Sequence, residues 1–537
     1  MRLCVKINYR FTVFPAKKMK RSQLIEKLTL TKQFDIIIIG GGATGLGAAV
    51  DAATRGYSTL LLEQDDFAKG TSSRSTKLVH GGVRYLQQGN IKLVMDALKE
   101  RGVLKKNAPH IVKNQSFIVP NYKWWEGPYY GLGLKVYDWM SGSLGLGNSE
   151  WLSTEEVLQR APTLDPEGLK GGVIYHDGQF DDARLAINLA QTAVEYGAVV
   201  LNRFKVNGLL KVNGKIVGVG ARDMETGLTY EIQSKSVINA TGVFSDTIQQ
   251  MDEPGKETSI NPSQGIHIVL DKEFLPGSAA IMIPHTDDGR VLFAVPWHNK
   301  IIVGTTDTAV DTISEEPKAL PEEVDFILHH AARYLTKDPG YSDIRSVFAG
   351  LRPLVKSSAK KTAEVSRDHS ILLATSGLIS IVGGKWTTYR KMAEDVVNTA
   401  TIQGGLPYKD CITTTTPIHG AMEVADFEKE GYYYGTDRES INDLIHSYSE
   451  MGKVLHPALP YTVAEIIWAV RNEWCLTLDD ALSRRTRALL LDAKAAIEMA
   501  PAVAAIMAKE LGKEGQWISE QLLSFNTVAQ NYLPKQL

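Results

Sequence analysis

Residues 34–45 read Phe34-Asp35-Ile36-Ile37-Ile38-Ile39-Gly40-Gly41-Gly42-Ala43-Thr44-Gly45, and this stretch decides the fold. Its first half is a β-branched run without polar alternation, which is typical of a strand buried on both faces. Small residues over 46–55 predict a helix after it, and the apolar residues 58–62 predict a second strand. Strand, glycine-rich turn, helix and strand together predict a βαβ unit at the start of a parallel sheet.

The glycines of this stretch predict a dinucleotide-binding turn. In the GxGxxG pattern the first glycine permits the tight turn, the second lets the backbone approach a pyrophosphate, and the third lets the helix pack on the sheet. The phosphates would lie at the positive end of the helix. Glu63, at the end of the second strand, would accept hydrogen bonds from a ribose diol and repel a 2′-phosphate, which argues against NADP. The alternative is a glycine-rich packing turn with a surface glutamate.

Two later segments favour FAD over NAD as the dinucleotide. Asn239-Ala240-Thr241-Gly242 ends a strand in a pattern that flavoproteins of this fold often place beneath the dinucleotide. Val382-Gly383-Gly384-Lys385 begins a helix-like stretch that would receive the flavin ring or its ribityl chain. Three separated segments that converge on one extended cofactor suit FAD better than NAD.

The composition is that of a soluble globular protein. The chain has 537 residues, of which 44% are hydrophobic and 22% charged, so we expect about three or four folding units and no wholesale disorder. Lys plus Arg number 59 against 61 for Asp plus Glu, and this balance does not favour nucleic acid as a partner. The three cysteines, Cys4, Cys411 and Cys475, are far apart, so we expect neither a disulfide framework nor a metal site.

The sequence contains no apolar run of the roughly 20 residues that would span a bilayer. Its basic N-terminus is interrupted by Lys6, Asn8 and Arg10, so we do not expect a secretory signal, and we assign residues 1–18 no function. Helical patterns and short strands alternate along the rest of the chain, and helices dominate after about residue 401. The expected helices are 92–106, 183–196, 463–472 and 478–499, and the expected strands are 236–240, 266–270, 291–295 and 301–303.

Residues 71–86, Thr71-Ser72-Ser73-Arg74-Ser75-Thr76-Lys77-Leu78-Val79-His80-Gly81-Gly82-Val83-Arg84-Tyr85-Leu86, closely resemble the hallmark stretch of FAD-dependent glycerol-3-phosphate dehydrogenases of the aerobic, quinone-linked type. Further segments are similar to the same family in the same order, namely 179–184, 239–242, 304–307, 350–354 and 383–390. The resemblance covers roughly residues 34 to 500.

The resemblance implies an α/β fold like that of glycine oxidase and glutathione reductase. We expect a discontinuous Rossmann-like FAD-binding domain, an antiparallel β cap over the substrate and an α-helical C-terminal domain. The expected boundaries are 31–95 with 171–255 and 345–400 for the FAD-binding domain, 96–170 with 256–344 for the cap, 401–537 for the helical domain and 1–30 for a tail.

The resemblance also implies a reaction and its partners. The enzyme would oxidise sn-glycerol 3-phosphate to dihydroxyacetone phosphate by hydride transfer from C2 to the flavin, and would pass the electrons to a membrane quinone. It would lie in the cytoplasm, peripherally on the inner face of the cytoplasmic membrane. The oligomeric state stays open, with a homodimer as one option.

The substrate is a small dianion with a secondary alcohol, so its site needs cations and a proton acceptor. Arginine suits bidentate phosphate recognition and lysine a point-charge contact. The positions that match the family's substrate-site cations are Arg84, Arg352, Arg367 and Lys385. Tyr85, next to Arg84, could donate a hydrogen bond to the phosphate, with a packed aromatic as the alternative. His267 is the candidate base, with Arg352 and Lys385 as the other catalytic candidates. Many relatives carry a lysine in the segment Ser263-Gln264-Gly265-Ile266-His267, and this chain lacks it.

The cofactor contacts come from the glycine-rich turns and from the hallmark stretch. They are Gly40, Gly42, Ala43, Thr44, Gly45, Glu63, Thr71, Ser72, Ser73, Ser75, Lys77, His80, Gly81, Gly82, Ala240, Thr241, Gly242, Gly384, Lys385 and Thr387. For several of them a purely structural role is the alternative: residues 71–77 could form a polar loop, and His80 could serve packing. We interpret the basic run Arg484-Arg485-Thr486-Arg487 as a solvated helix face, with lipid or partner contact as the alternative.

Three other functions compete with this prediction. An oxidase of the same fold would hand electrons to oxygen and release hydrogen peroxide, but such relatives typically carry an insertion for which this chain is too short. A flavin protein that modifies RNA should show a basic stripe and a reactive cysteine or folate site, and neither is evident. A flavin-binding protein without turnover would not need the intact set of cations.

Overall fold

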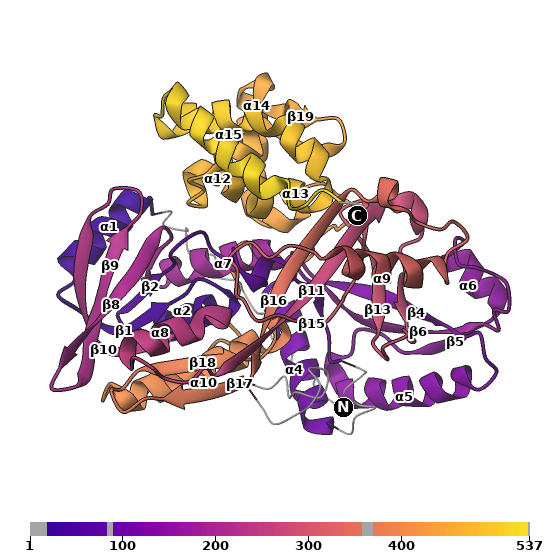
Figure 1. Ribbon diagram of the computed structural model, residues 1–537, viewed down its shortest axis with the longest axis horizontal. Coiled ribbons are helices and arrows are strands. Elements are labelled where there is room, and N and C mark those ends of the chain that lie inside the picture. Colours follow the sequence, from indigo (N-terminus) through magenta and orange to yellow (C-terminus); the bar gives the residue numbers. More distant parts are fainter. Residues whose placement is uncertain (1–18, 83–89, 357–368, 535–537) are drawn as a thin grey trace, which may run out of the picture.

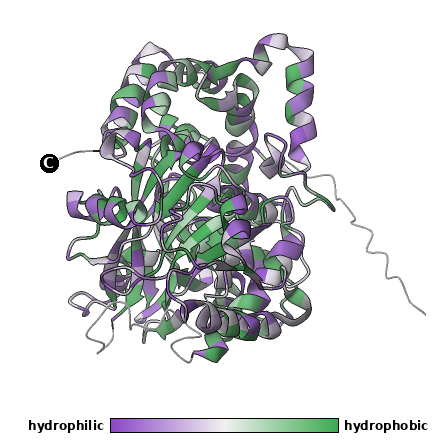
Figure 2. Cartoon of the chain, turned by 90° about the vertical axis from the view of Figure 1, so that its right-hand side faces the viewer, coloured by the Kyte–Doolittle hydropathy of each residue, from purple (hydrophilic) through white to green (hydrophobic). Residues whose placement is uncertain are grey.

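The computed structural model describes residues 19–82, 90–356 and 369–534. Two sheets lie side by side, and a group of helices covers them from one end (Figure 1). Apolar strands fill the interior of both sheets, whereas the helices carry polar residues on their outer sides (Figure 2). This layering follows from burying the apolar runs of the strands beneath amphipathic helices.

The first sheet is built around β1 (Gln33–Ile39), which is buried as its apolar run predicts. It pairs in parallel with β2 and β10, and the parallel part continues to β7 on one side and to β18 on the other. Three antiparallel strands complete the sheet at the β18 and β10 edges. The other strands are β2 (Thr59–Leu62), β7 (Val199–Leu201), β8 (Phe204–Val212), β9 (Lys215–Asp223), β10 (Thr229–Asn239), β17 (His369–Leu373) and β18 (Ile379–Gly383).

Helix α2 (Ala43–Thr54) follows the glycine-rich turn and packs between α7 (Asp182–Glu195) and α10 (Tyr389–Gln403). Small residues make this packing close: a Cβ at Gly47 would lie 2.8 Å from the Tyr389 ring. The βαβ start expected from the sequence is therefore confirmed, and its helix is buried on both flanks.

Helix α1 (Arg21–Leu30) corrects the expected tail over residues 1–30. It packs against β7, and its Leu24 and Leu28 are buried in the core of the first domain. Arg21 donates a hydrogen bond to Asp223 at 2.7 Å. The sequence prediction missed this helix because only two of its apolar side chains face the core.

The second sheet forms the cap. Its strand order is β15-β11-β14-β13-β12-β4-β6-β3, with β16 on β11 and β5 on β6. All pairs are antiparallel except β12 with β4, which is parallel, so the sheet is mixed rather than purely antiparallel. The strands are β3 (Leu78–Val79), β4 (Lys113–Pro120), β5 (Glu150–Leu152), β6 (Gly172–Gln179), β11 (Ile260–Asp271), β12 (Ala280–Ile283), β13 (Leu292–Trp297), β14 (Lys300–Gly304), β15 (Thr308–Ala309) and β16 (Ser346–Val355).

These pairings move the expected domain boundaries. The boundaries expected for the FAD-binding domain include β3, β6 and β16. All three strands belong instead to the cap sheet. The boundary at residue 400 falls inside α10. Pairing between strands that are far apart in the sequence decides to which domain a strand belongs. Local sequence patterns do not contain this information. The remaining helices of these two domains are α4 (Ile91–Asn107), α5 (Glu126–Ser141), α6 (Thr154–Arg160), α8 (Ser245–Asp252) and α9 (Pro321–Ala332).

The C-terminal domain is helical, as expected, apart from one short hairpin. Its core also takes in Val269, Trp297, Ile302 and Phe348 from the cap sheet, so the domain is fastened to the cap. The elements are α11 (Asp437–Ser447), β19 (Val454–His456), β20 (Leu459–Thr462), α12 (Val463–Asn472), α13 (Ala488–Leu491), α14 (Ala493–Leu511) and α15 (Gly515–Ala529). The helix expected over 478–499 is broken before α13 and again at Asp492.

A buried ion cluster joins this domain to the loop after β2. Arg485 contacts Asp66 at 2.7 Å, and Arg484 contacts the same carboxylate at 2.5 Å. All three side chains are almost fully buried. Burial alone would raise the pKa of Asp66, but Arg485 and Arg484 hold it below its ordinary value.

The interpretation of residues 484–487 as a solvated face is therefore wrong. All four residues are buried. The fourth, Arg487, pairs with Asp182 at 2.9 Å and donates a hydrogen bond to the carbonyl of Ser73.

We expect Arg485→Met to lower the thermal midpoint of unfolding by about 3–5 °C. Removing one partner of a buried ion pair costs about 3–5 kcal/mol because the other charge stays buried. Arg471→Met is the matched control, since Arg471 pairs with Glu510 at 2.6 Å but is half exposed. That substitution should cost less than about 1 kcal/mol. Equal midpoints for the two variants, measured by scanning calorimetry, would contradict the stabilising role of the cluster.

Candidate active site

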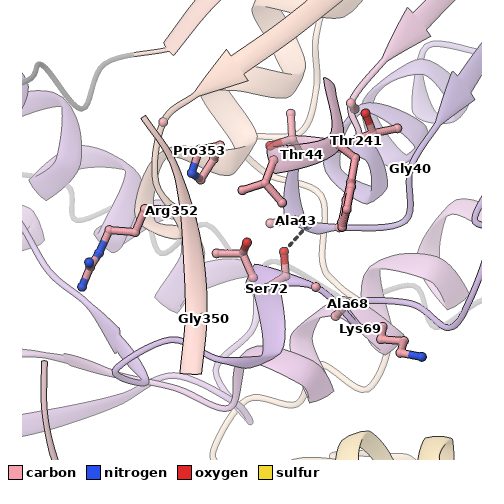
Figure 3. A pocket seen from close by; sticks show the side chains of 18 of the residues that line it. Gly40, Ala43, Thr44, Ala68, Lys69, Ser72, Thr241, Gly350, Arg352 and Pro353 are labelled. Atoms are coloured by element: carbon pink, nitrogen blue, oxygen red, sulfur yellow. Dashed lines mark hydrogen bonds between the residues drawn. The ribbon is translucent and has the colours of Figure 1, made fainter. Parts of the chain in front are cut away.

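A cavity of about 610 Å³ lies between the two sheets. Its lining comes from the ends of β1, β2, β10 and β18 on one side and from β11 and β16 on the other. Figure 3 shows the turn at Gly40, Ala43 and Thr44 facing Gly350, Arg352 and Pro353 of β16. A cavity of this size at the carboxyl ends of parallel strands is the usual place for a ligand in this architecture.

The glycine-rich turn forms one end of the cavity. Gly40 has a φ of +108°, and a Cβ there would lie 2.6 Å from the carbonyl oxygen of Ala240. A Cβ at Gly45 would lie 1.9 Å from the carbonyl oxygen of Gly40. Gly45 does not line the cavity. It lies where α2 packs closely against the turn, which is the role that the sequence predicts for the third glycine. Gly40 and Gly42 therefore leave the backbone before the helix open to the cavity, and this fits a pyrophosphate.

Glu63 lies beside this turn at the end of β2. Its carboxylate accepts hydrogen bonds from the backbone N–H of Gly41 at 2.6 Å and of Asp65 at 2.9 Å. Burial raises the pKa of Glu63 to about 7. The carboxylate lines the cavity where an acceptor for a ribose diol was expected, so the residues fit a dinucleotide.

Two further segments complete this end. The hydroxyl of Ser72 accepts a hydrogen bond from the N–H of Ala43 at 3.0 Å, drawn in Figure 3, and ties the hallmark stretch to the turn. Gly384 has a φ of +83°, and a Cβ there would lie 2.3 Å from the sulfur of Met392. Together with the end of β10, these segments place most of the predicted cofactor contacts around one cavity: Gly40, Gly42, Ala43, Thr44, Glu63, Thr71, Ser72, Ser75, His80, Ala240, Thr241, Gly242, Gly384, Lys385 and Thr387.

Arg352 marks the other end of the cavity. Its guanidinium donates to the hydroxyl of Thr305 at 3.1 Å and to the carbonyl of Thr306 at 2.9 Å, and it pairs with Asp307 at 3.3 Å. A Cβ at Gly265 would lie 2.3 Å from this guanidinium. The glycine therefore makes the room in which the cation lies, and the surrounding oxygens hold its planar group in one orientation.

His267 lines the same end. Its ring stacks on Phe348 with centroids 4.9 Å apart, and its Nε2 is 2.9 Å from the hydroxyl oxygen of Thr76. Its Nδ1 is buried and has no hydrogen-bond partner among the described residues. Burial, Lys77 and Arg352 lower the pKa of His267 well below its ordinary value. The imidazole is therefore neutral at physiological pH, the form that can accept a proton.

Lys77 departs from the prediction of a cofactor contact. It is fully buried and does not line the cavity, and its ammonium contacts Asp182 at 2.6 Å and the Ser73 carbonyl at 2.8 Å. Burial lowers the pKa of Lys77 to about 7. Ser73, Gly81 and Gly82 also lie outside the lining. The N–H of Gly81 instead donates to the hydroxyl of Tyr137. In a hallmark stretch, side chains that hold the loop and side chains that face the ligand alternate, and residue type alone does not separate them.

Three predicted substrate contacts, Arg84, Tyr85 and Arg367, lie outside the described residues. The sequence prediction also missed Thr76, which lines the cavity, and three residues outside the lining that hold Arg352. Thr76 contacts His267, and the run Thr305-Thr306-Asp307 surrounds Arg352. The signal for that run was its similarity to the family, and the pairing of Gly304 with His267 explains why it lies at the site. In the described part of the chain no cluster of His, Cys, Asp or Glu could hold a metal ion.

Comparison with known proteins places the chain among flavoproteins. Residues 35–390 match the family described as FAD dependent oxidoreductase, and residues 379–517 match the C-terminal domain of alpha-glycerophosphate oxidase. A probable mitochondrial glycerol-3-phosphate dehydrogenase of Caenorhabditis elegans is 40% identical, over 93% of this chain and 73% of that protein. The mitochondrial glycerol-3-phosphate dehydrogenase of Saccharomyces cerevisiae is 36% identical, over 96% of this chain and 92% of that protein.

Solved structures agree with these matches. Glycerol-3-phosphate dehydrogenase from Bacillus halodurans, crystallised with FAD, aligns with a TM-score of 0.76 and 31% identity, over 96% of this chain and 99% of that chain. Glycine oxidase from Geobacillus kaustophilus aligns with a TM-score of 0.53 at 18% identity, over 72% of this chain and 98% of that chain, and supports the fold alone. The fold class expected from the sequence is confirmed.

We expect the affinity for FAD to rise about ten-fold between pH 6 and pH 8. A ribose diol donates to the ionised form of Glu63, whose pKa is about 7 before binding, so FAD binding must release a proton at low pH. Glu63→Gln should bind FAD about ten- to a hundred-fold more weakly at pH 8 and lose the pH dependence. Glu315→Gln, at an exposed carboxylate of the same lining, is the control. Titration of FAD into apoprotein by fluorescence measures both, and an unchanged profile for Glu63→Gln would refute the role.

Proposed function

We infer that this chain, which belongs to the glycerol-3-phosphate dehydrogenase family of FAD-dependent oxidoreductases, oxidises sn-glycerol 3-phosphate to dihydroxyacetone phosphate. FAD is its cofactor, as the sequence predicts. The observation that carries the reaction is the juxtaposition of two unlike ends in one cavity. A glycine-rich turn with Glu63 suits a dinucleotide, and Arg352 with His267 at the opposite end suits a phosphorylated alcohol.

Arg352 is the proposed phosphate anchor. Its guanidinium is oriented by Thr305, Thr306 and Asp307, so little rotational freedom is lost when a dianion binds. Lys385, at the cavity wall next to Gly384, would add a second positive charge. Arg84, Tyr85 and Arg367 remain proposed substrate contacts on the strength of the family resemblance.

His267 is the proposed base. The bound flavin supplies the acceptor for the hydride that leaves C2. The neutral imidazole would take the proton of the C2 hydroxyl at a ring nitrogen, while Phe348 fixes the plane of the ring and Thr76 fixes one nitrogen. Burial lowers the pKa of this histidine, and Lys77 and Arg352 lower it further. A dianion on Arg352 offsets part of that effect and makes the base stronger once substrate is bound.

The electron acceptor, the location and the assembly are separate proposals, which rest on the resemblance to quinone-linked enzymes. We propose a membrane quinone as the acceptor and a peripheral position on the inner, cytoplasmic face of the cytoplasmic membrane. No helix in the described part of the chain is long and apolar enough to cross a membrane. A homodimer is the proposed alternative to a monomer.

Stopped-flow spectroscopy tests the function directly. Anaerobic mixing with sn-glycerol 3-phosphate should bleach the flavin absorbance, whereas glycerol and lactate should not. Reoxidation of the bleached enzyme should be fast with a soluble ubiquinone analogue and slow with oxygen. A flavin that stays oxidised with the substrate would refute the function, and rapid reoxidation by oxygen with stoichiometric peroxide would assign an oxidase instead.

Arg352→Ala should lower kcat/KM about thirty- to a thousand-fold, chiefly through KM. The reason is the loss of a desolvated, charge-assisted contact worth about 2–4 kcal/mol. Arg352→Lys should recover only part of the loss, since a lysine cannot donate two parallel hydrogen bonds to the phosphate as a guanidinium does. Arg345→Ala is the control on the same segment, because Arg345 pairs with Asp271 at the surface. If steady-state kinetics show equal KM values for Arg352→Ala and Arg345→Ala, the anchor lies elsewhere.

His267→Ala should slow flavin reduction by about a hundred-fold or more. In the wild type, the rate should rise with pH through the pKa of His267, since only the neutral ring accepts a proton. This pKa lies well below its ordinary value in free enzyme, so the acid limb of kcat/KM should lie at lower pH than that of kcat. The substrate phosphate also titrates, with a pKa of about 6. The measurement is therefore the difference between the pH–rate profiles of the wild type and His267→Ala at low pH. Identical profiles would show that His267 has only a structural role.

A further inference from the structure

His267, the proposed base, presents neither ring nitrogen freely to the cavity. Its Nε2 lies 2.9 Å from the hydroxyl oxygen of Thr76, and its Nδ1 is buried and has no hydrogen-bond partner among the described residues. A neutral imidazole has one lone pair in the ring plane, on whichever nitrogen carries no hydrogen. In one tautomer this lone pair faces Thr76, and in the other it is buried. A substrate hydroxyl in the cavity therefore has no ring nitrogen to which it can donate its proton directly.

The packing around the ring keeps both nitrogens in place. Phe348 stacks on the imidazole with an interplanar angle of 16°. Gly304 pairs with His267 across the sheet, and a Cβ at this glycine would overlap the ring carbon Cδ2. Turning the ring out of its plane would bring it against these neighbours. A proton that reaches the imidazole from the cavity must therefore arrive at Nε2, on the side of Thr76.

Thr76 is held in position by both of its neighbours in the sequence. The hydroxyl of Ser75 donates to a carboxylate oxygen of Asp182 at 2.7 Å, and the ammonium of Lys77 contacts the same oxygen at 2.6 Å. Asp182 is the first residue of α7 and is fully buried. Thr76, between these two anchored residues, lines the cavity and contacts the imidazole. Its hydroxyl therefore lies at a fixed place between the cavity and Nε2 of His267.

We propose that Thr76 is a catalytic residue, whose hydroxyl relays the proton of the substrate's C2 hydroxyl to Nε2 of His267. A threonine hydroxyl can accept one hydrogen bond while it donates another. The O–H bond at C2 breaks as the oxygen of Thr76 takes that proton, and the proton that Thr76 already carried moves to Nε2. The hydride leaves C2 with its electron pair for the bound flavin, so that C2 and its oxygen become the carbonyl group of the product. This relay rests on the proposed function and adds the route of the proton to it.

The buried side of the ring accounts for the return of the proton after each turnover. Once Nε2 is protonated, Nδ1 carries the second hydrogen of the imidazolium, and it has no acceptor among the described residues. Burial lowers the pKa of His267, and Lys77 and Arg352 lower it further. The ring therefore keeps the proton only while a dianion on Arg352 offsets these effects. When the product leaves, the proton returns to the cavity through Thr76.

Three substitutions at position 76 distinguish a relay from a residue that only orients the ring. Thr76→Val keeps the shape of the side chain without its hydroxyl, so flavin reduction at saturating sn-glycerol 3-phosphate should slow about a hundred-fold. Thr76→Ser keeps the hydroxyl and should reduce its flavin close to the wild-type rate. Thr76→Ala leaves room for a water molecule in place of the hydroxyl and should be about ten-fold faster than Thr76→Val. Thr399→Val is the control, since Thr399 lies on α10 and its hydroxyl donates to the carbonyl of Asp395.

The number of protons that move during flavin reduction gives a second measurement. In mixtures of H₂O and D₂O, the rate of the wild type should fall along a curve as the fraction of D₂O rises, because two protons move together. The rate of Thr76→Val should fall along a straight line, because at most one proton moves. A straight line for the wild type, with Thr76→Val and Thr76→Ala equally slow, would show that Thr76 only orients the ring.

Binding of dihydroxyacetone phosphate to the oxidised, FAD-loaded protein is the measurement that does not depend on turnover. Its Kd, read from the change in flavin absorbance, should rise at most about ten-fold in Thr76→Val, the effect of one neutral hydrogen bond. A loss of binding as large as the loss of rate would make Thr76 a substrate contact and overturn the relay. Flavin reduction by Thr76→Val at the wild-type rate would also overturn it, whereas a wild type that is not reduced at all would refute the proposed function instead.

Discussion

The close approach of three backbone segments at the end of β1 is the constraint on which the rest of the structure depends. Gly40, Gly45 and the carbonyl of Ala240 meet with no room for a Cβ at either glycine. This contact sets how α2 leaves the sheet and where β10 ends beside it. Those two positions define the dinucleotide end of the cavity, and the cap sheet closes over it. A methyl group at Gly45 would therefore separate a helix from its sheet rather than trim a surface contact.

The charged side chains of the cavity favour one orientation of a bound ligand. Glu63 lies at the turn, where the hydroxyl groups of a ribose can donate hydrogen bonds to its carboxylate. Arg352 lies toward the other end, where it would repel a cation and attract a phosphate. Burial, together with Lys77 and Arg352, lowers the pKa of His267 and keeps its ring neutral. An extended cofactor and a small dianion can thus share one cavity with each in its own electrostatic environment.

Local patterns predicted the parts of the fold whose physics is local. The run of isoleucines before Gly40 is compatible with a strand covered on both faces, and the spacing of the turn glycines matches the close approach of strand, helix and ligand. The motifs also located both ends of the site, including His267 and Arg352. Residues 484–487 were misread because a basic run has the same local appearance whether water or a distant carboxylate surrounds it. Lys77 was misread for the same reason, and the strands β6 and β16 were misassigned because their partners are far away in the sequence.

The ion cluster around Asp66 has a consequence for how the protein is made. Asp66 follows the second strand of the nucleotide-binding unit, whereas its partners Arg484 and Arg485 are 418 and 419 residues further along the chain. At a synthesis rate of roughly 5–20 residues per second, the nascent chain carries this unneutralised carboxylate for about 20–80 seconds before the arginines appear. The ion cluster that holds this loop can therefore form only after Arg484 and Arg485 have left the ribosome, long after the nucleotide-binding unit itself has been synthesised.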